Sequence, residues 1–242
     1  EVGTATEYSI ALPDFAELPG NTNVTGIRFR SFTTSSGDFI EGAESGIGDL
    51  IVSVFGGYNV IDESFASTGS SAFHLSTGEI GTTQTITSPY AYLIGDSSNL
   101  SFQSMVRSAT DTQIAKVNIS LDNGVSWINK FSQPGLTPQG VSGGPDENSF
   151  SEKNIDLSAY ENRTIHIQFE YDHLGGFAFP GSDSNVGWFF DDINLTGVQS
   201  MNSITTSDLI TESTSIDFTP GAVGDVSLQA QGMLHDFYEM EW

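Results

Sequence analysis

The sequence of 242 residues contains no cysteine, so neither a disulfide framework nor a thiolate metal site is available to it. It also contains no apolar run that approaches the ~20 residues needed to span a bilayer, and Glu1-Val-Gly-Thr lacks the features of a signal peptide. We therefore expect no membrane insertion, and we expect either a product whose signal has been removed or a fragment of a longer chain. The strand-like ending at Trp242 favours the fragment.

Basic residues are also scarce, because 7 Lys and Arg stand against 31 Asp and Glu, for a formal net charge of −24. Such a field repels phosphate backbones, anionic membranes and uronate or sulfated polymers. This balance argues against nucleic acid as a partner. The same field concentrates divalent cations around the protein.

Convincing helical periodicity is absent, and period-two alternation takes its place. The clearest strand is 164–171, where Ile165, Ile167 and Phe169 alternate with polar residues. Segments 99–106 and 115–121 alternate in the same way, and Asp122-Asn-Gly124 marks a hairpin turn between strands. These patterns predict two stacked antiparallel sheets. The expected shared core comprises Leu100, Phe102, Val117, Ile119, Ile165, Ile167, Phe169, Ile193 and Leu195.

The chain divides by pattern into a middle and two flanks. We expect residues 38–198 to form the sandwich. Residues 1–37 and 199–242 contain short strand-like pieces that are too small to be domains, so we expect them to pair with each other as a small second β unit, to dock on the sandwich or to belong to neighbouring domains.

The stretch Gly187-Trp-Phe-Phe-Asp-Asp-Ile-Asn-Leu195 interrupts its own strand pattern. Phe189, Ile193 and Leu195 share one face in period-two spacing, and Asp191 is predicted to lie on that same apolar face. A carboxylate directed into a core is costly unless a cation or several donors satisfy it. Asp191 and Asp192 therefore indicate a Ca²⁺ site made of oxygen ligands, with a solvent-exposed strand end as the alternative.

Signatures of catalysis are missing. The four histidines lack the His-x-x-x-His spacing of zinc hydrolases, and no Gly-x-Ser-x-Gly elbow or phosphate-binding glycine loop is present. Adjacent strand residues point to opposite faces, so Asp191 and Asp192 cannot flank one glycosidic bond. We expect no catalytic residues, and hence no enzyme activity within this chain.

Two long loops rich in glycine and proline interrupt the strands, at 132–149 and 173–185. Long loops on a rigid scaffold commonly bind ligands. Phe177 and Phe179 in the second loop, with Tyr90 and Tyr92 near another turn, are the candidates for stacking on a ligand. Packing at the end of the sandwich is the alternative role for these rings.

Three motifs occur in an order that resembles a known family. Strand and hairpin 117–127 (VNISLDNGVSW), turn 155–160 (IDLSAY) and strand 187–193 (GWFFDDI) together resemble the MAM-like and choice-of-anchor J group of bacterial extracellular domains, which includes the cleaved-adhesin modules of surface proteases. The resemblance covers roughly residues 38–198. It implies an antiparallel jelly-roll β-sandwich, here with additional flanking β-strands.

The resemblance also implies a calcium ligand set. In that family a Glu of an opening Phe-Glu pair ligates Ca²⁺ together with the Asp of the closing strand. The nearest match is Asp38-Phe-Ile-Glu-Gly42, in which an Ile separates Phe39 from Glu41. The implied ligands are Glu41 with Asp191 and Asp192, Glu44 and Asp49 are substitutes for Glu41, and the strand near 70–74 adds backbone carbonyls.

Two functional interpretations follow from the pattern and the resemblance together. The first is a non-catalytic, calcium-stabilised ancillary module of a secreted bacterial hydrolase that binds polysaccharide, and the charge of −24 favours a neutral glycan. The second is a structural or adhesive spacer of a secreted or cell-surface protease, without a glycan ligand. Both place the chain outside the cell, with cell-surface material and neighbouring domains of a larger polypeptide as partners.

Overall fold

The computed structural model describes residues 7–10, 28–36, 38–76, 78–179, 181, 183–203, 226–229 and 238–241. The chain divides into two compact units, one formed by 35–201 and the other by 1–34 with 202–242. Within the described ranges the regular structure is β-strand with short 3-10 turns and no α-helix. No helix among these residues is long and apolar enough to cross a membrane.

Among its described residues, the smaller unit contains two antiparallel strand pairs. Strand β1 (Glu7–Ile10) pairs with β14 (Val226–Gln229), and Tyr8 lies opposite Leu228. Strand β2 (Arg28–Ser36) pairs with β15 (Tyr238–Glu241). The remainder of the predicted flanking segments, 1–37 and 199–242, lies largely outside the described residues.

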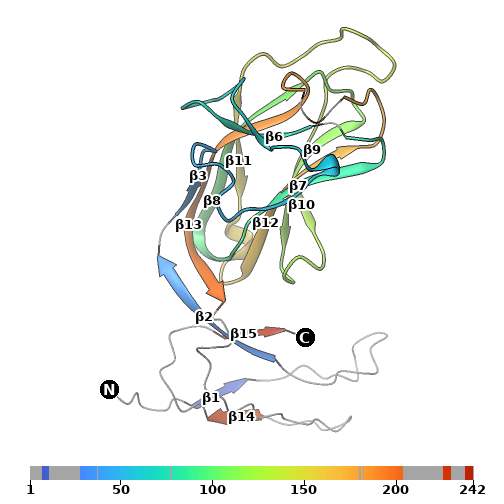
Figure 1. Cartoon of the computed structure of the whole chain (residues 1–242). Helices are drawn as coiled ribbons and strands as arrows, with labels where there is room; N and C mark the ends of the chain where they lie inside the picture. Colours follow the sequence, from blue (N-terminus) through green and yellow to red (C-terminus); the bar gives the residue numbers. More distant parts are fainter. Residues whose placement is uncertain are drawn as a thin grey trace, which may run out of the picture. The chain divides into compact units, whose positions relative to one another are not determined.

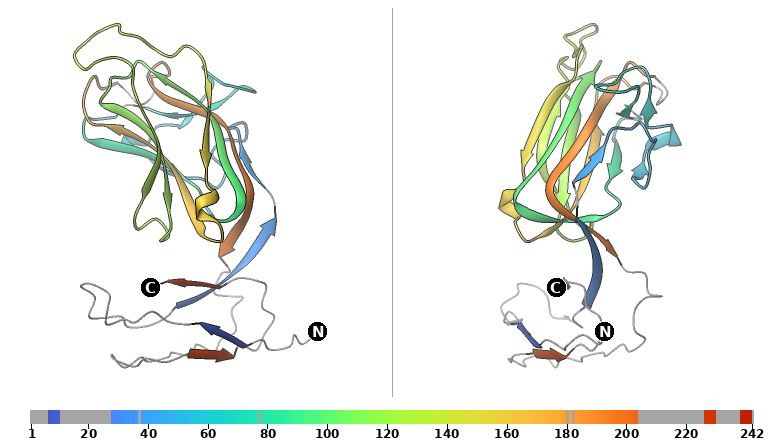
Figure 2. Two further views of the ribbon diagram at one scale, coloured as in Figure 1. Left: turned by 180° about the vertical axis from the view of Figure 1, so that it is seen from behind. Right: turned by 90° about the vertical axis from the view of Figure 1, so that its left-hand side faces the viewer.

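The larger unit is a sandwich of antiparallel strands (Figures 1 and 2). One sheet has β11, β8 and β13 side by side, with β6 and then β5 at one part of the far edge of β13 and β3 at another part. The other sheet has the order β10-β9-β12-β7-β4. The strands are β3 (Phe39–Glu41), β4 (Ile51–Ser53), β5 (Ile61–Asp62), β6 (Ala72–Leu75), β7 (Thr82–Thr87), β8 (Ala91–Arg107), β9 (Gln113–Ser120), β10 (Ile128–Pro134), β11 (Ser151–Asp156), β12 (Thr164–His173) and β13 (Gly187–Ser203). The 3-10 turns are η2 (Phe55–Gly57) and η3 (Ser158–Tyr160).

The long strand β8 joins the two sheets. Its first part, around Tyr92, pairs with the start of β12 at Ile165, and its later part pairs with β11 at Glu152. Figure 1 shows β8 and β13 running alongside each other. The fold prediction, an antiparallel jelly-roll β-sandwich with additional flanking strands, is confirmed.

The core consists of the side chains that the alternation predicted. All nine expected core residues, Leu100, Phe102, Val117, Ile119, Ile165, Ile167, Phe169, Ile193 and Leu195, are buried in one hydrophobic cluster. Aromatic rings fill its centre, where Phe169 stacks on Phe190 with ring centroids 4.5 Å apart and Trp188 lies 4.6 Å from Phe190. The predicted turn is also present, because Asn123 and Gly124 both have positive φ between β9 and β10.

Candidate functional site

In the closing strand β13, the alternation between core-facing and outward-facing side chains shifts by one residue at Asp191 and Asp192. Asp192 has a φ of 50°, and the register between β13 and β8 shifts between Asp191 and Asn194. Such a β-bulge inserts one extra residue and changes which side chains face the core. Before the bulge the core-facing residues are Trp188 and Phe190, and after it they are Ile193 and Leu195.

The bulge overturns the predicted orientation of Asp191. Phe189 contacts Phe65 and His74 rather than the central cluster, with ring centroids 5.1 Å and 4.3 Å away. Asp191 lies two residues further on the same side, so it does not share a face with Ile193 and Leu195. The strict period-two pattern was wrong here because one residue in left-handed conformation shifts every later side chain to the other face.

Asp191 is nevertheless buried, under the loop 63–71. Its side chain accepts hydrogen bonds from the amides of Ser67 (2.8 Å), Thr68 (3.3 Å) and Asp192 (2.7 Å). Burial raises the pKa of Asp191, while these amides act in the opposite direction and lower it. The Thr68 hydroxyl donates to Asp192, so both aspartates hold the same loop against β13.

The acidic residues of the opening segment have different partners, and Glu44 is the one that accepts hydrogen bonds from this loop among the described contacts. Glu41 accepts a hydrogen bond from the Ala43 amide at 3.2 Å. Glu44 accepts from the amides of Ser70 and Ser71, each at 2.9 Å, and these bonds lower the pKa of Glu44. Asp49 instead accepts a hydrogen bond from the Tyr90 hydroxyl.

Few carboxylates lie close to Asp191 and Asp192 to act as further ligands of a cation. A Cβ placed on Gly42 would lie 3.6 Å from Asp191 Oδ1 and 3.9 Å from Asp192 Oδ1, so the end of β3 passes close to both aspartates. Within the part of the chain that is described, no three His, Cys, Asp or Glu side chains cluster closely enough to hold a metal ion. A cation here would therefore need backbone carbonyls or water to complete its coordination.

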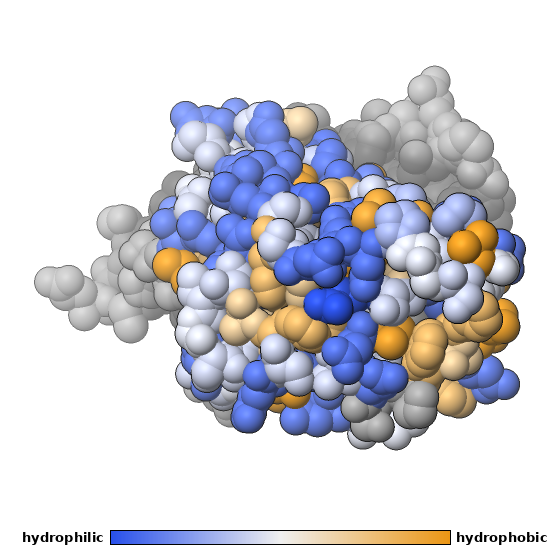
Figure 3. Space-filling model, turned by 90° about the horizontal axis from the view of Figure 1, so that it is seen from above, coloured by the Kyte–Doolittle hydropathy of each residue, from blue (hydrophilic) through white to orange (hydrophobic). Residues whose placement is uncertain are grey.

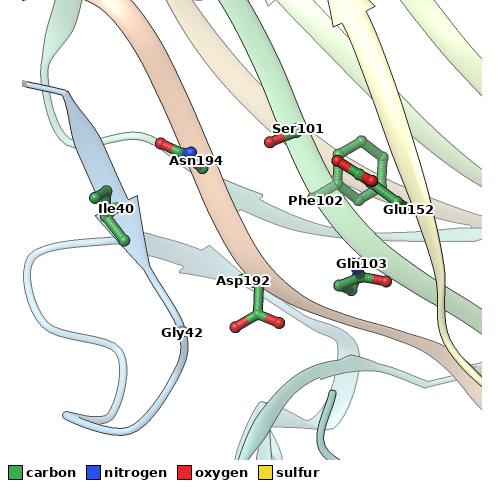
Figure 4. A pocket seen from close by; sticks show the side chains of 8 residues that line it. All are labelled: Ile40, Gly42, Ser101, Phe102, Gln103, Glu152, Asp192 and Asn194. Carbon is green, nitrogen blue, oxygen red and sulfur yellow. The ribbon is translucent and has the colours of Figure 1, made fainter. Parts of the chain in front are cut away.

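A groove of about 320 Å³ crosses the outer face of the β3-β13-β8-β11 sheet, next to the bulge. Its lining residues are Ile40, Gly42, Ser101, Phe102, Gln103, Glu152, Asp192 and Asn194 (Figure 4). Strand pairing places them in rows, because Asn194 lies opposite both Ile40 and Ser101, while Gln103 lies opposite Glu152. Phe102 is 1% exposed and belongs to the core, so the accessible lining is mainly polar.

The groove is rich in hydrogen-bond acceptors. The Oδ1 atom of Asn194 is buried and has no hydrogen-bond partner among the described residues, which is costly unless a water supplies a donor. Glu152 and Asp192 add carboxylates, and none of the eight lining residues is basic. The chemistry of the groove therefore suits a ligand that offers several O–H or N–H donors.

The four aromatic candidates do not form one surface. Tyr92 is 1% exposed and packs against Phe39 with ring centroids 5.5 Å apart, so its predicted role as a stacking residue does not fit this structure. Burial in the sandwich also raises the pKa of its hydroxyl. Tyr90 is half-buried and lies beside Asp49. Phe177 is 47% exposed and Phe179 is half-buried, both in the loop after β12.

The two long loops meet at one end of the sandwich. The Phe177 carbonyl accepts a hydrogen bond from Gln113 Nε2, and a Cβ on Gly175 would lie 2.7 Å from Gln139 Nε2. Pro180 and Ser182 of the second loop lie outside the described residues. Figure 3 views the molecule from above and shows apolar patches separated by hydrophilic residues. Leu136, Val141, Leu174 and Phe177 are exposed in these two loops.

Sequence reasoning missed the groove. Ser101 and Gln103 alternate with the predicted core positions Leu100 and Phe102, so their outward orientation was available from the pattern. The pattern does not tell which strands become neighbours. The contributions of Ile40 and Glu152 depend on the pairing of strands that are far apart in the sequence.

No family model matches the sequence, and no curated protein matches it. Matches do occur among solved structures. The K3 cleaved adhesin domain of Lys-gingipain from Porphyromonas gingivalis W83 is 13% identical and has a TM-score of 0.45, with 67% of this chain and 99% of that chain covered. A xylan-binding domain from CBM 22 is 9% identical, with a TM-score of 0.40 and coverage of 65% and 92%. TmCBM61 in complex with β-1,4-galactotriose is 14% identical, with a TM-score of 0.38 and coverage of 64% and 93%. These similarities are too distant to assign a ligand to this chain.

Proposed function

We propose that this chain is a non-catalytic ancillary module of a longer, secreted or cell-surface bacterial polypeptide, and that it binds polysaccharide in the groove on the β3-β13-β8-β11 face. The observation that carries the proposal is the polar lining of the groove, in which Glu152 and Asp192 contribute carboxylates and no basic residue is present. Sugar hydroxyls donate hydrogen bonds to amides and carboxylates of this kind. Ile40, which is 72% exposed, supplies an aliphatic surface at one wall.

Affinity electrophoresis through gels that contain soluble polysaccharides tests this proposal. The intact chain should be retarded by at least one glycan. The double variant Ser101→Ala/Gln103→Ala should lose most of that retardation, because it removes polar groups from the groove but changes no core residue. Val125→Ala is the control, since Val125 is 84% exposed and lies in the β9–β10 turn.

A second variant separates the groove from the loop end. Phe177→Ala removes the exposed ring from the loop after β12 and leaves the groove intact. If Phe177→Ala alone loses retardation, the glycan binds at that loop and not in the groove. If no glycan retards the intact chain, the polysaccharide proposal is wrong and the spacer interpretation replaces it.

We also propose that Ca²⁺ binds beside the bulge, held by Asp191 and Asp192 together with Glu41. The support is a buried carboxylate whose pKa is raised by burial and that lies next to a second carboxylate and the backbone at Gly42. A cation would relieve the cost of this burial. Bound calcium would hold the loop 63–71 and the end of β3 together.

Thermal unfolding with and without chelator tests the calcium proposal. A ligand that binds only the folded state adds about 2.7 kcal/mol of stability when its concentration is 100 times its Kd. The melting temperature should therefore rise with calcium in the intact chain and much less in Asp192→Asn. An unchanged melting temperature, with no calcium found by elemental analysis, would refute the site.

A further inference from the structure

The polar groups of the groove are unequally distributed between donors and acceptors. Glu152 and Asp192 contribute carboxylates, which are acceptors only when ionised. Donors come from the hydroxyl of Ser101 and the amide of Gln103, which also accept. None of the lining residues carries a positive charge.

The two carboxylates stand on opposite sides of the strand that lies between them. Gln103 of β8 is opposite Glu152 on β11 and opposite Asp191, the neighbour of Asp192, on β13. Neighbouring strands lie roughly 4.8 Å apart. Figure 4 shows the strand of Gln103 between the strand of Asp192 and the strand of Glu152. A ligand seated over Gln103 would therefore have a carboxylate on each side.

Neither carboxylate is neutralised by a cation of this chain among the described residues. The described salt bridges are Arg107 with Asp146 and Lys116 with Glu170 and Asp172, and none involves Glu152 or Asp192. The formal net charge of −24 adds a field that attracts cations to the whole surface. A positively charged donor fits this environment better than a neutral one.

We infer that the groove prefers a polysaccharide of amino sugars with free ammonium groups over its acetylated or neutral counterparts. The inference rests on the proposed polysaccharide-binding function and names the substrate class of that same groove. An ammonium group donates three hydrogen bonds and supplies the positively charged partner that the carboxylates of Glu152 and Asp192 lack among the described residues. An acetamide or a hydroxyl at the same position keeps a donor but loses the charge.

Three hexasaccharides with the same β-1,4 linkage isolate this preference, because they differ at carbon 2 alone. They are hexamers of glucosamine, N-acetylglucosamine and glucose, and their affinities for the full chain are measured by isothermal titration calorimetry in chelator at low salt. We expect the glucosamine hexamer to bind at least tenfold more tightly than either of the other two. Its advantage should shrink as salt is raised, because salt screens exposed charges.

Two variants assign the preference to the groove. Glu152→Gln should lower affinity for the glucosamine hexamer about fivefold, in line with a partly exposed charge pair, and should leave affinity for the glucose hexamer unchanged. Glu79→Gln removes the same charge from an exposed position outside the groove and should change neither affinity. Glu152 is not one of the proposed calcium ligands, and the chelator keeps calcium away from Asp192, so both carboxylates keep their charge in the comparison.

The outcomes distinguish a failure of the amino-sugar preference from a failure of the proposed polysaccharide binding. If the glucose or N-acetylglucosamine hexamer binds as tightly as the glucosamine hexamer, the preference is wrong and the polysaccharide site stands. If Glu152→Gln and Glu79→Gln weaken binding equally, the general field of the protein causes the preference and the groove does not. If no hexamer binds and no gel retards the chain, the proposed function itself fails.

Discussion

Asp191 and Ser67 are 124 residues apart in the sequence, and the Ser67 amide donates a hydrogen bond of 2.8 Å to Asp191 Oδ2. Thr68 and Asp192 donate to the same carboxylate, so one buried side chain anchors a loop to the closing strand. The loop covers Phe189 through the ring of Phe65. The bulge at which the period-two prediction fails is therefore also the point where this loop is attached.

Replacement of Asp191 should detach the loop. In Asp191→Ala three backbone amides lose their acceptor, and each unsatisfied buried donor costs about 1–3 kcal/mol. We expect a net loss of about 2–4 kcal/mol in the free energy of unfolding, measured by urea denaturation. Asp96→Ala at an exposed position should change it by no more than about 0.5 kcal/mol. Equal effects of the two substitutions would show that the anchor is not formed.

The stacked aromatic rings of the core predict a large loss of stability when one of them is removed. Phe190 contacts Phe169, Trp188 and Phe73, with ring centroids 4.5 Å, 4.6 Å and 5.3 Å away. Phe190→Ala would leave a cavity among them and should cost about 3–5 kcal/mol in the free energy of unfolding. Phe189→Ala is the informative comparison, because Phe189 packs outside this cluster and its loss should leave the fluorescence of Trp188 closer to that of the unaltered chain.

Gly187 begins the closing strand in a conformation that L side chains rarely adopt. Its φ is 119°, and a Cβ added there would lie 2.5 Å from the Leu75 carbonyl oxygen. Gly187→Ala must therefore move backbone as well as accept strain, and we expect it to lower the melting temperature more than Gly46→Ala does. Gly46 also has a positive φ, of 79°, but a Cβ there meets nothing within 4 Å. Similar melting temperatures for the two variants would contradict the close approach of β13 to β6.

The sequence predicted the core well because alternation is a local property. Ile165, Ile167 and Phe169 follow one another at period two, and no tertiary information is needed to place them on one face. Tyr92 illustrates the limit of that reasoning. It follows a turn and carries a hydroxyl, so it looked accessible, yet its strand pairs with both β12 and β13 and buries the ring.

The candidate site depends on information that alternation does not contain. The orientation of Asp191 was wrong because one residue of left-handed backbone at Asp192 changes the phase of the strand. The approach of Gly42 to both aspartates, and of Glu152 to Gln103, depends on the order of strands in the sheet. The resemblance selected the segments that contain Glu41 and Asp191, and the structure pairs strand β3 with strand β13 so that Glu41 lies opposite Ile193.

The Asp122 carboxylate in the hairpin between β9 and β10 predicts that the stability of the fold depends on pH in the acid range. Hydrogen bonds from the Ser126 hydroxyl and amide, and from the Ser120 hydroxyl, lower the pKa of Asp122 to about 2. Because the folded-state pKa lies below the unfolded value of about 3.9, the ionised carboxylate stabilises the folded state above about pH 4. That contribution is lost as the pH falls through the range from about 4 to about 2.

Asp122→Asn should therefore lower the melting temperature at pH 6 and lose most of this effect near pH 2, where the natural carboxyl is about half protonated in the folded state and fully protonated in the unfolded state. Differential scanning calorimetry of both chains between pH 6 and pH 2 measures the difference. Asp96→Asn, at an exposed position, controls for the general relief of negative charge, which should favour the folded state slightly at neutral pH. A difference between Asp122→Asn and the natural chain that stays constant across this range would contradict the hydrogen bonds that hold the Asp122 carboxylate in the turn.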